Sequence, residues 1–258
     1  MFRSMLKNEI KIFFTALMFF TRIPCPKWVD HSQEYLSKSS RYFPLIGIIV
    51  GGIGALVYYG CSFIFPHPLA LLLSMIATIL ATGAFHEDGL ADMCDGFGGG
   101  WTKESILRIM KDSRVGTFGV VGLCSVLAIK FVCLYYMETK WIPLILISGH
   151  ALSRFAASTL LYTLDYVRDD ADSKAKPAAG RMSTLSLCVG AVFGITPLAL
   201  FLNYYVFALL VPVFIARWYL GYYFKKWIGG QTGDCGGATQ QICEVMFYLS
   251  FIVLWKYI

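Results

Sequence analysis

Seven apolar stretches, each close to the length that crosses a lipid bilayer, follow one another along this chain. They cover residues 43–65, 69–85, 118–137, 141–162, 185–202, 205–220 and 242–257. A membrane-spanning helix needs roughly 20 apolar residues. Of the 258 residues, 57% are hydrophobic and only 15% are charged, which is more apolar surface than a soluble core of this length could bury. The sequence therefore predicts an all-α protein, a polytopic transmembrane helical bundle of about seven spans, with one domain over residues 1–258.

A shorter apolar segment at residues 13–20 cannot cross a membrane, and the basic residues around it favour a short interfacial or re-entrant helix. Lysine and arginine also gather before the first predicted span and after the second, fourth and sixth. The loop at 66–68 has neither, and the loop at 137–141 has only Lys140. By the positive-inside rule, we expect the N-terminus and the charged loops in the cytoplasm. Seven spans place the C-terminus outside, although a weak last span would change that parity.

The segment 86–100, HEDGLADMCDGFGGG, places several acidic residues at the end of the second apolar stretch. On a helix, Asp88, Asp92 and Asp95 have the spacing i, i+4, i+7 and lie within roughly 60° of one face. Like charges on one stripe repel one another unless a cation lies among them, and Mg²⁺ prefers carboxylate and phosphate oxygens. We therefore predict a metal site for phosphate chemistry at a membrane surface. His86 could orient a carboxylate, act as a base or cap the helix.

Two further polar motifs lie in loops predicted on the same side of the membrane. Residues 110–119, MKDSRVGTFG, follow a predicted amphipathic helix at 102–110. Here Asp112 could be a further metal ligand and Arg114 a phosphate clamp, or the two could form a simple salt bridge. Residues 229–244, GGQTGDCGGATQQICE, contain five glycines whose backbone could bind an anion, with Thr232 and Asp234 adding polar groups. The alternative is a flexible connection between two spans.

Other charged and polar residues have simpler interpretations. The loop at 165–181 has mixed charges that are typical of a solvated loop. Ionisable residues inside predicted spans are functional candidates, namely Lys130, His150 and Arg154, although Lys130 could only extend to the interface. Gln240 and Glu244 are one turn apart and could lie at the membrane surface.

Carboxylates that hold Mg²⁺, an arginine and glycine-rich backbone suit phosphoryl or phosphodiester transfer. From the residues alone we expect a membrane-embedded, metal-dependent transferase that acts on a diphosphate-linked donor.

Five motifs in order resemble those of the adenosylcobinamide-GDP ribazoletransferase family, also called cobalamin synthase. They are FFTRIPCP (19–26), RYFPLIGIIVGG (41–52), HEDGLADMCDG (86–96), MKDSRVGTFG (110–119) and GGQTGDCGGA (229–238). The resemblance implies a multi-pass protein of the cell inner membrane with cytoplasmic active-site loops. It implies Mg²⁺ as cofactor and the transfer of adenosylcobinamide phosphate from adenosylcobinamide-GDP to α-ribazole or its 5′-phosphate, with release of GMP. It implies membrane lipid but no nucleic acid as a partner, and it is compatible with a homo-oligomer or a complex with other enzymes of the pathway.

Mapped onto this chain, the resemblance assigns the metal to Asp88, Asp92 and Asp95. The expected catalytic residues are His86, Asp95, Asp112, Arg114 and Asp234, with Asp112 or Asp234 completing the metal shell or accepting the hydroxyl proton. The expected substrate-binding residues are Arg114, Gly230, Gln231, Thr232 and Gly233.

Two other classes compete with this interpretation. The acidic motif also resembles that of the CDP-alcohol phosphotransferases of lipid synthesis, but their D-G-x₂-A-R element with its arginine is missing, since Asp92 and not arginine follows Gly89-Leu90-Ala91. A secondary transporter would place its carboxylates near the middle of the membrane and in pseudo-symmetric halves, and no such repeat is present.

Overall fold

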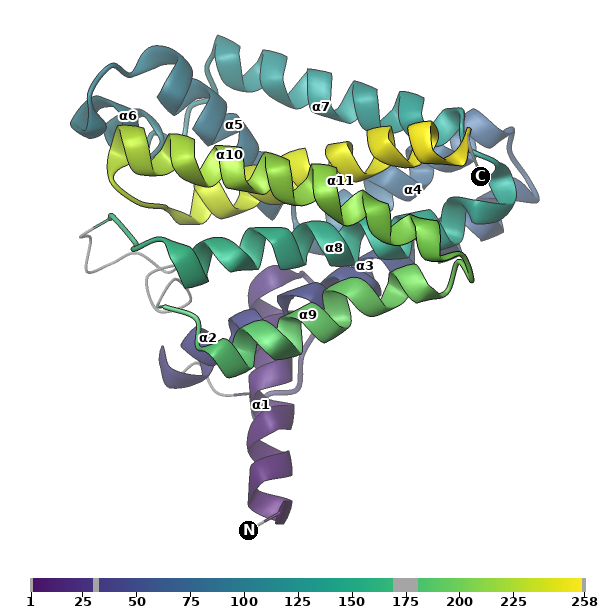
Figure 1. Ribbon diagram of the computed structural model, residues 1–258, viewed down its shortest axis with the longest axis horizontal. Coiled ribbons are helices and arrows are strands. Elements are labelled where there is room, and N and C mark those ends of the chain that lie inside the picture. The colour runs from purple at the N-terminus through teal and green to yellow at the C-terminus, as the bar shows by residue number, and fades with distance from the viewer. Residues whose placement is uncertain (1, 30–32, 169–180, 257–258) are drawn as a thin grey trace.

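The computed structural model describes residues 2–29, 33–168 and 181–256, and these residues form a helical bundle (Figure 1). In chain order the helices are α1 (Phe2–Phe20), α2 (Gln33–Ser39), α3 (Phe43–Ser62), α4 (His67–Thr82), α5 (Phe85–Gly99), α6 (Lys103–Ile109), α7 (Thr117–Tyr135), α8 (Ile142–Thr163), α9 (Thr184–Ala199), α10 (Leu210–Ile228) and α11 (Gly233–Trp255). Short 3₁₀ helices at Ser40–Tyr42, Thr139–Trp141 and Tyr204–Leu209 precede α3, α8 and α10.

The predicted polytopic bundle is confirmed. Within the described ranges, five segments are long and apolar enough to cross a membrane, namely Glu34–Ser62, Thr117–Tyr135, Thr139–Thr163, Tyr204–Ile228 and Gly233–Trp255. The pair α4 and α5 could form a sixth, broken span, and α9 is a shorter apolar helix. These segments correspond in order to the seven apolar stretches of the sequence.

The helix α1 differs in direction from the bundle. It covers Phe2–Phe20, more than the predicted segment 13–20, and does not meet the criteria for a membrane span. In Figure 1 it lies across the direction of α7, α8, α10 and α11. That orientation agrees with a helix that lies along the membrane surface.

The chain bends sharply between α4 and α5. Gly83 and Ala84 both have left-handed backbone angles, with φ of 65° and 58°. The amides of Gly83 and Ala84 donate to the carbonyls of Leu80 and Ile79, which closes the end of α4. As a result α5 turns by 87° from α4, and the acidic motif forms a helix of its own. The predicted span at 69–85 therefore ends earlier, at Thr82.

The last span begins earlier than the sequence indicated. We expected it over residues 242–257, but α11 starts at Gly233, directly after Thr232, whose hydroxyl accepts the amide of Cys235 at 3.3 Å. The alternative that residues 229–244 form a flexible connection is thus wrong from Gly233 onward, where they are helical. The span predicted at 205–220 likewise extends to Ile228.

Close helix contacts in the bundle depend on small residues. A Cβ atom on Gly51 of α3 would stand 2.7 Å from the Cα atom of Ile147 on α8, so only glycine allows this separation. This is the packing by small residues that is common between membrane helices.

A buried polar network joins four helices in the interior. The carboxylate of Glu244 on α11 lies 3.1 Å from the Lys130 ammonium on α7 and 3.6 Å from Nδ1 of His150 on α8. It also accepts hydrogen bonds from Gln240 at 2.6 Å and from Tyr248 at 3.0 Å. Lys130 and Glu244 are thus paired inside the bundle, and the expectations that they lie at the interface are wrong.

The same network reaches α5 and the second buried cation. Gln241 accepts from Lys130 at 2.7 Å and donates to Glu87 at 2.8 Å, which is the residue before Asp88. Arg154 contacts His150 with its Nη1 atom at 2.9 Å. The two carboxylates thus balance Lys130 and Arg154 in a region with little access to water.

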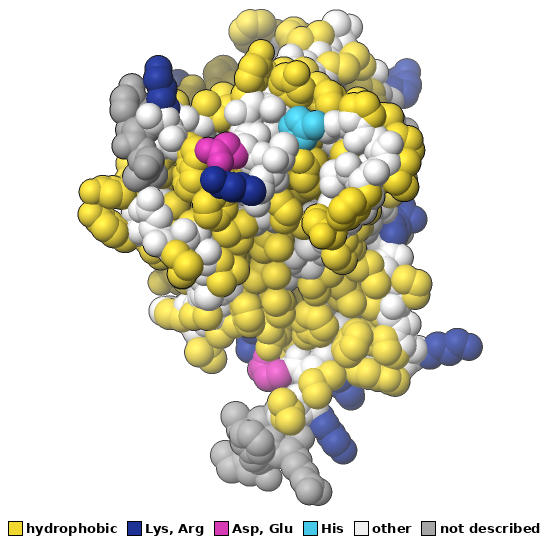
Figure 2. Space-filling view, turned by 90° about the vertical axis from the view of Figure 1, so that its right-hand side faces the viewer, with side chains coloured by type: hydrophobic (Ala, Val, Ile, Leu, Met, Phe, Trp, Pro, Cys, Tyr) yellow, Lys and Arg dark blue, Asp and Glu magenta, His cyan; other side chains and the backbone are white. Residues whose placement is uncertain are grey.

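The two ends of the bundle differ in charge. The acidic helix α5, α6 and the turn between α10 and α11 lie at one end (Figure 1). The face at the other end is mostly hydrophobic and shows few charged side chains (Figure 2). This asymmetry agrees with the distribution of basic loops in the sequence.

Replacement of Glu244 tests the importance of the buried network. We expect Glu244→Gln to lower the unfolding temperature of the detergent-solubilised protein clearly, because removal of one partner of a buried ion pair costs about 3–5 kcal/mol. The control is Glu138→Gln, which removes an exposed pair with Lys140 and should change the temperature little. Equal unfolding temperatures for both variants would contradict this role of Glu244.

Candidate active site

The start of α11 packs directly against α5. A Cβ atom on Gly89 would stand 3.1 Å from the Cα and carbonyl oxygen atoms of Asp234, and one on Gly237 would stand 3.2 Å from the carbonyl oxygen of His86. Glycine at both positions therefore lets the two backbones approach. The motifs at 86–96 and 229–238, far apart in the sequence, meet at this contact.

Three carboxylates gather beside the contact. Asp92, half-buried on α5, is repelled by the charges of Asp234 and Asp88, and less by Asp95. Asp88 is exposed, and Asp234 projects from the first turn of α11. The result is a concentration of negative charge at the end of the bundle, contributed by two helices.

Asp95 has a different environment. Its two oxygens accept hydrogen bonds from the amides of Gly116 at 2.6 Å and Gly119 at 2.8 Å, at the start of α7. The side chain is buried, and a Cβ atom on either glycine would collide with it. Asp95 therefore fastens α5 to the N-terminus of α7, where a carboxylate is favourable.

The positive partner of the carboxylates is Arg168. Its Nη2 atom donates to Asp234 at 2.6 Å and to the carbonyl of Met110 at 3.2 Å. The sequence interpretation missed this residue because it lies in the loop that was interpreted as solvated. Residues 169–180 of that loop are outside the described part of the chain.

A short backbone pairing brings Arg168 to the site. The amide of Gln231 donates to the carbonyl of Asp165 at 2.9 Å, and the amide of Val167 donates to the carbonyl of Gln231 at 3.1 Å. A Cβ atom on Gly230 would overlap the Asp165 carbonyl, so this pairing requires glycine. Gly229, with φ of 82°, ends α10 just before it. Gly230 and Gly237 of this motif thus serve close backbone contacts, and Gly229 serves a left-handed turn.

Asp112 and Arg114 form an exposed pair with each other. Two oxygens of Asp112 accept from the Arg114 guanidinium, the shorter distance being 2.6 Å, and one accepts from its amide at 3.1 Å. These hydrogen bonds lower the pKa of Asp112 to about 2. The guanidinium is 87% exposed. This arrangement is the salt bridge that the sequence left open as an alternative.

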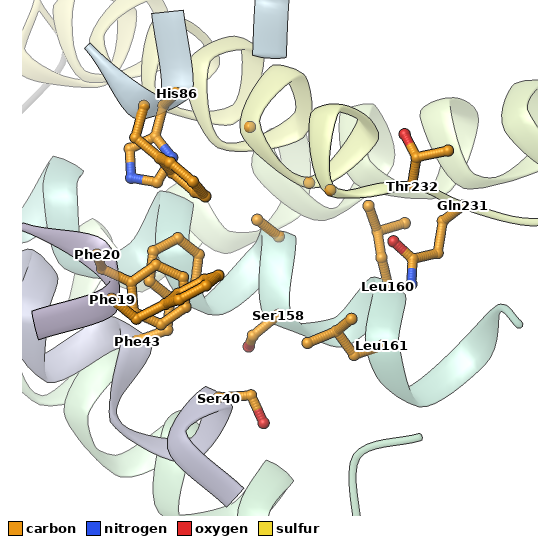
Figure 3. Close-up of a pocket in the computed structure, with 15 residues that line it drawn as sticks. Phe19, Phe20, Ser40, Phe43, His86, Ser158, Leu160, Leu161, Gln231 and Thr232 are labelled. Atoms are coloured by element: carbon orange, nitrogen blue, oxygen red, sulfur yellow. The ribbon is translucent and has the colours of Figure 1, made fainter. Parts of the chain in front are cut away.

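His86, Gln231, Thr232 and Gly233 line a cavity beside the carboxylates (Figure 3). The ring of His86 is buried, and neither ring nitrogen has a hydrogen-bond partner among the described residues. A capping role of His86 is therefore wrong. Thr232 is fully buried and caps α11, and Gly233 begins that helix.

Within the described parts of the chain, no group of three or more His, Cys, Asp or Glu side chains is arranged so that it could hold a metal ion by itself. The three aspartates of α5 do not form such a group, because Asp95 is turned toward α7. A metal ion bound by Asp88 and Asp92 would need oxygen atoms from a substrate to complete its coordination shell.

The contact between α5 and α11 can be tested by enlarging a glycine. We expect Gly89→Val to lower the unfolding temperature of the solubilised protein, because overpacking costs typically about 1–3 kcal/mol. The matched control is Gly52→Val on α3, where a Cβ atom would have no neighbour within 4 Å. An unfolding temperature for Gly89→Val equal to that of the control would show that the contact is loose.

Comparison with known proteins identifies the family. A family model described as cobalamin-5-phosphate synthase matches residues 12–252. Proteins named adenosylcobinamide-GDP ribazoletransferase from Shewanella frigidimarina, Shewanella amazonensis and Ralstonia pickettii are each 46% identical to the chain. The alignments cover 96%, 98% and 93% of this chain and 96%, 99% and 94% of those proteins. No significant match to a solved structure is found. The chain belongs to the cobalamin-5-phosphate synthase family.

Proposed function

We propose that this protein transfers the adenosylcobinamide-phosphate group of adenosylcobinamide-GDP to α-ribazole or its 5′-phosphate, in a late step of cobalamin synthesis. The products are adenosylcobalamin or its phosphate, and GMP. Similarity over nearly the whole chain to relatives named adenosylcobinamide-GDP ribazoletransferase supports the proposal. The structural observation that carries it is the meeting of α5 and α11 at Gly89 and Gly237, which gathers the carboxylates of two motifs beside a cavity.

Mg²⁺ is the cofactor that the donor set suits best. Asp88 and Asp234 both raise the negative potential at Asp92, and among the described residues the salt bridge at this site is that of Arg168 with Asp234, so the site has an excess of negative charge. Asp88 and Asp92 would hold the ion with water and the diphosphate oxygens, because Mg²⁺ commonly takes only one or two protein carboxylates. When bound, the ion would neutralise the diphosphate and favour ionisation of the attacking hydroxyl.

The remaining residues have distinct roles in this proposal. Asp234 accepts the proton of the ribazole hydroxyl. As the proton leaves, the hydroxyl oxygen forms a bond to the phosphorus next to the corrinoid arm. The bond from that phosphorus to the GMP oxygen breaks, and GMP leaves with the electron pair. Arg168 orients Asp234 through the 2.6 Å contact. Asp95 holds α5 in place through α7 and is not a metal ligand in this proposal, because both of its oxygens accept backbone amides.

In this proposal Arg114 and Asp112 take part in binding of the donor substrate and not in binding of the metal ion. Both lie in the segment after α6, and the side chain of Arg114, which is 87% exposed, can exchange Asp112 for a phosphate of the large donor. We further propose that the protein lies in the inner membrane and that the end of the bundle with α5 and α6 is on the cytoplasmic side, because the basic loops lie at that end.

The activity assay uses washed membranes that contain this protein, mixed with adenosylcobinamide-GDP and α-ribazole. We expect adenosylcobalamin and GMP with Mg²⁺ and neither product with EDTA. Membranes with intact protein that yield no product under either condition would contradict the proposed reaction. Formation of labelled lipid from a CDP-alcohol in the same membranes would instead support the rival class, which the family match does not favour.

Replacement of Asp92 tests the metal ligands. We expect Asp92→Asn to insert normally but to lose activity by at least about 100-fold at any Mg²⁺ concentration, because a neutral amide binds the ion poorly. Glu104→Gln on α6 is the control, since that carboxylate is exposed at the same end of the bundle. Normal turnover of Asp92→Asn would exclude Asp92 as a ligand.

A further inference from the structure

The cavity beside the carboxylates has walls from several parts of the chain. Phe19 and Phe20 come from the end of α1, Phe43 from the start of α3, and Ser158 from α8. Figure 3 shows His86 above the three phenylalanine rings, and Gln231 and Thr232 on the opposite side. Four of the five sequence motifs that mark the family therefore contribute to one cavity.

Two polar groups in the wall have no partner. The imidazole of His86 is 1% exposed, and both of its nitrogens lack a hydrogen bond within the described structure. The Nε2 atom of Gln231, also 1% exposed, lacks one as well. Leaving such a group unpaired is unfavourable in a folded protein. A ligand that accepts hydrogen bonds from the imidazole N–H and the glutamine amide would remove part of this cost.

The other walls suit a flat aromatic ring. The rings of Phe20 and Phe43 are stacked with centroids 4.2 Å apart, and the ring of Phe43 lies 5.4 Å from that of His86. Aromatic surfaces of this kind favour a planar ligand by stacking and by exclusion of water. The side chains that line the cavity include no aspartate or glutamate.

These features discriminate between the aromatic parts of the two substrates. The base of α-ribazole is a benzimidazole with methyl groups, a flat aromatic ring system in which one nitrogen carries the ribose and the other accepts a hydrogen bond. Guanine carries several N–H donors, which need acceptors when they are buried. The imidazole N–H of His86 and the Gln231 amide supply donors, and the side chains that line the cavity include no carboxylate. The cavity therefore suits the benzimidazole better than the guanine, whose several donors would meet no carboxylate.

We propose that this cavity binds the aromatic base of the acceptor nucleoside, with a nitrogen of His86 donating to the free ring nitrogen. This assignment rests on the proposed function. Its geometry suits the reaction, because Gly237 packs against the backbone of His86, and Gly233, which lines the cavity, is the residue directly before Asp234. A base bound here directs its ribose toward the carboxylates of α5 and α11. The corrinoid donor then approaches from the exposed side of Asp88.

The test combines binding and kinetics for two variants. His86→Phe keeps a ring of similar size without nitrogens, and Ser158→Leu fills the cavity from α8. The control is His67→Phe on α4, where the histidine contacts Tyr58 instead. Binding of α-ribazole to purified protein in lipid nanodiscs is measured without donor and Mg²⁺, and KM is measured for each substrate in turnover.

We expect both variants to weaken α-ribazole binding, or to raise its KM, by at least about tenfold, with the donor KM unchanged. The control should behave like the wild-type protein, and excess guanosine should not displace α-ribazole. A raised KM for the donor alone would assign the cavity to the donor and overturn the proposal. Unchanged values for both substrates in the folded variants would also overturn it.

These outcomes are distinct from a failure of the proposed function. In that case the wild-type protein itself would form no adenosylcobalamin from the two substrates. If wild-type turnover is normal but binding without donor is too weak to measure, the KM for α-ribazole in the same variants decides. If one variant does not fold, the other still tests the cavity.

Discussion

The arrangement of the active site depends on the backbone contact between α5 and α11. Gly89 and Gly237 allow the two helices to approach so closely that a Cβ atom at either position would push the facing backbone away. The bend at Gly83 makes this possible, because it turns the acidic helix away from the direction of α4. One close contact thereby brings together carboxylates that are far apart in the sequence, and the cavity beside them forms at the same place.

Two polar systems hold this contact from different sides. On the interior side, Gln241 connects Glu87 of α5 to Lys130 and so to Glu244 of α11. At the surface end, Asp95 accepts two amides of α7, and Arg168 joins Asp234 to the end of α6. The carboxylates of the site are therefore carried on helices that these ion pairs and hydrogen bonds hold in place. Such support is what positions ligands for metal-assisted chemistry.

The sequence predicted the elements better than their contacts. The apolar stretches and the acidic helix were predicted because hydrophobic length and helical spacing are local properties. The start of α11 was not predicted, because in a sequence the glycines that permit close helix packing cannot be distinguished from glycines that form a loop. Arg168 and the partners of Asp95 were missed for another reason. Both depend on residues distant in the chain, and no local pattern distinguishes Arg168 from the other charges in its loop.

The buried pair of Lys130 and Glu244 also has a consequence for the biogenesis of the protein. A lysine near the middle of a lone span costs about 2.5–3.5 kcal/mol during insertion. The helix with Lys130 leaves the ribosome long before the helix with Glu244, so the early spans enter the bilayer with a positive charge that has no partner. The partner arrives only with α11, which carries Glu244. The charge of Lys130 is therefore neutralised only after α11 has been synthesised, and a variant without α11 would leave this lysine unpaired with Glu244 in the bilayer.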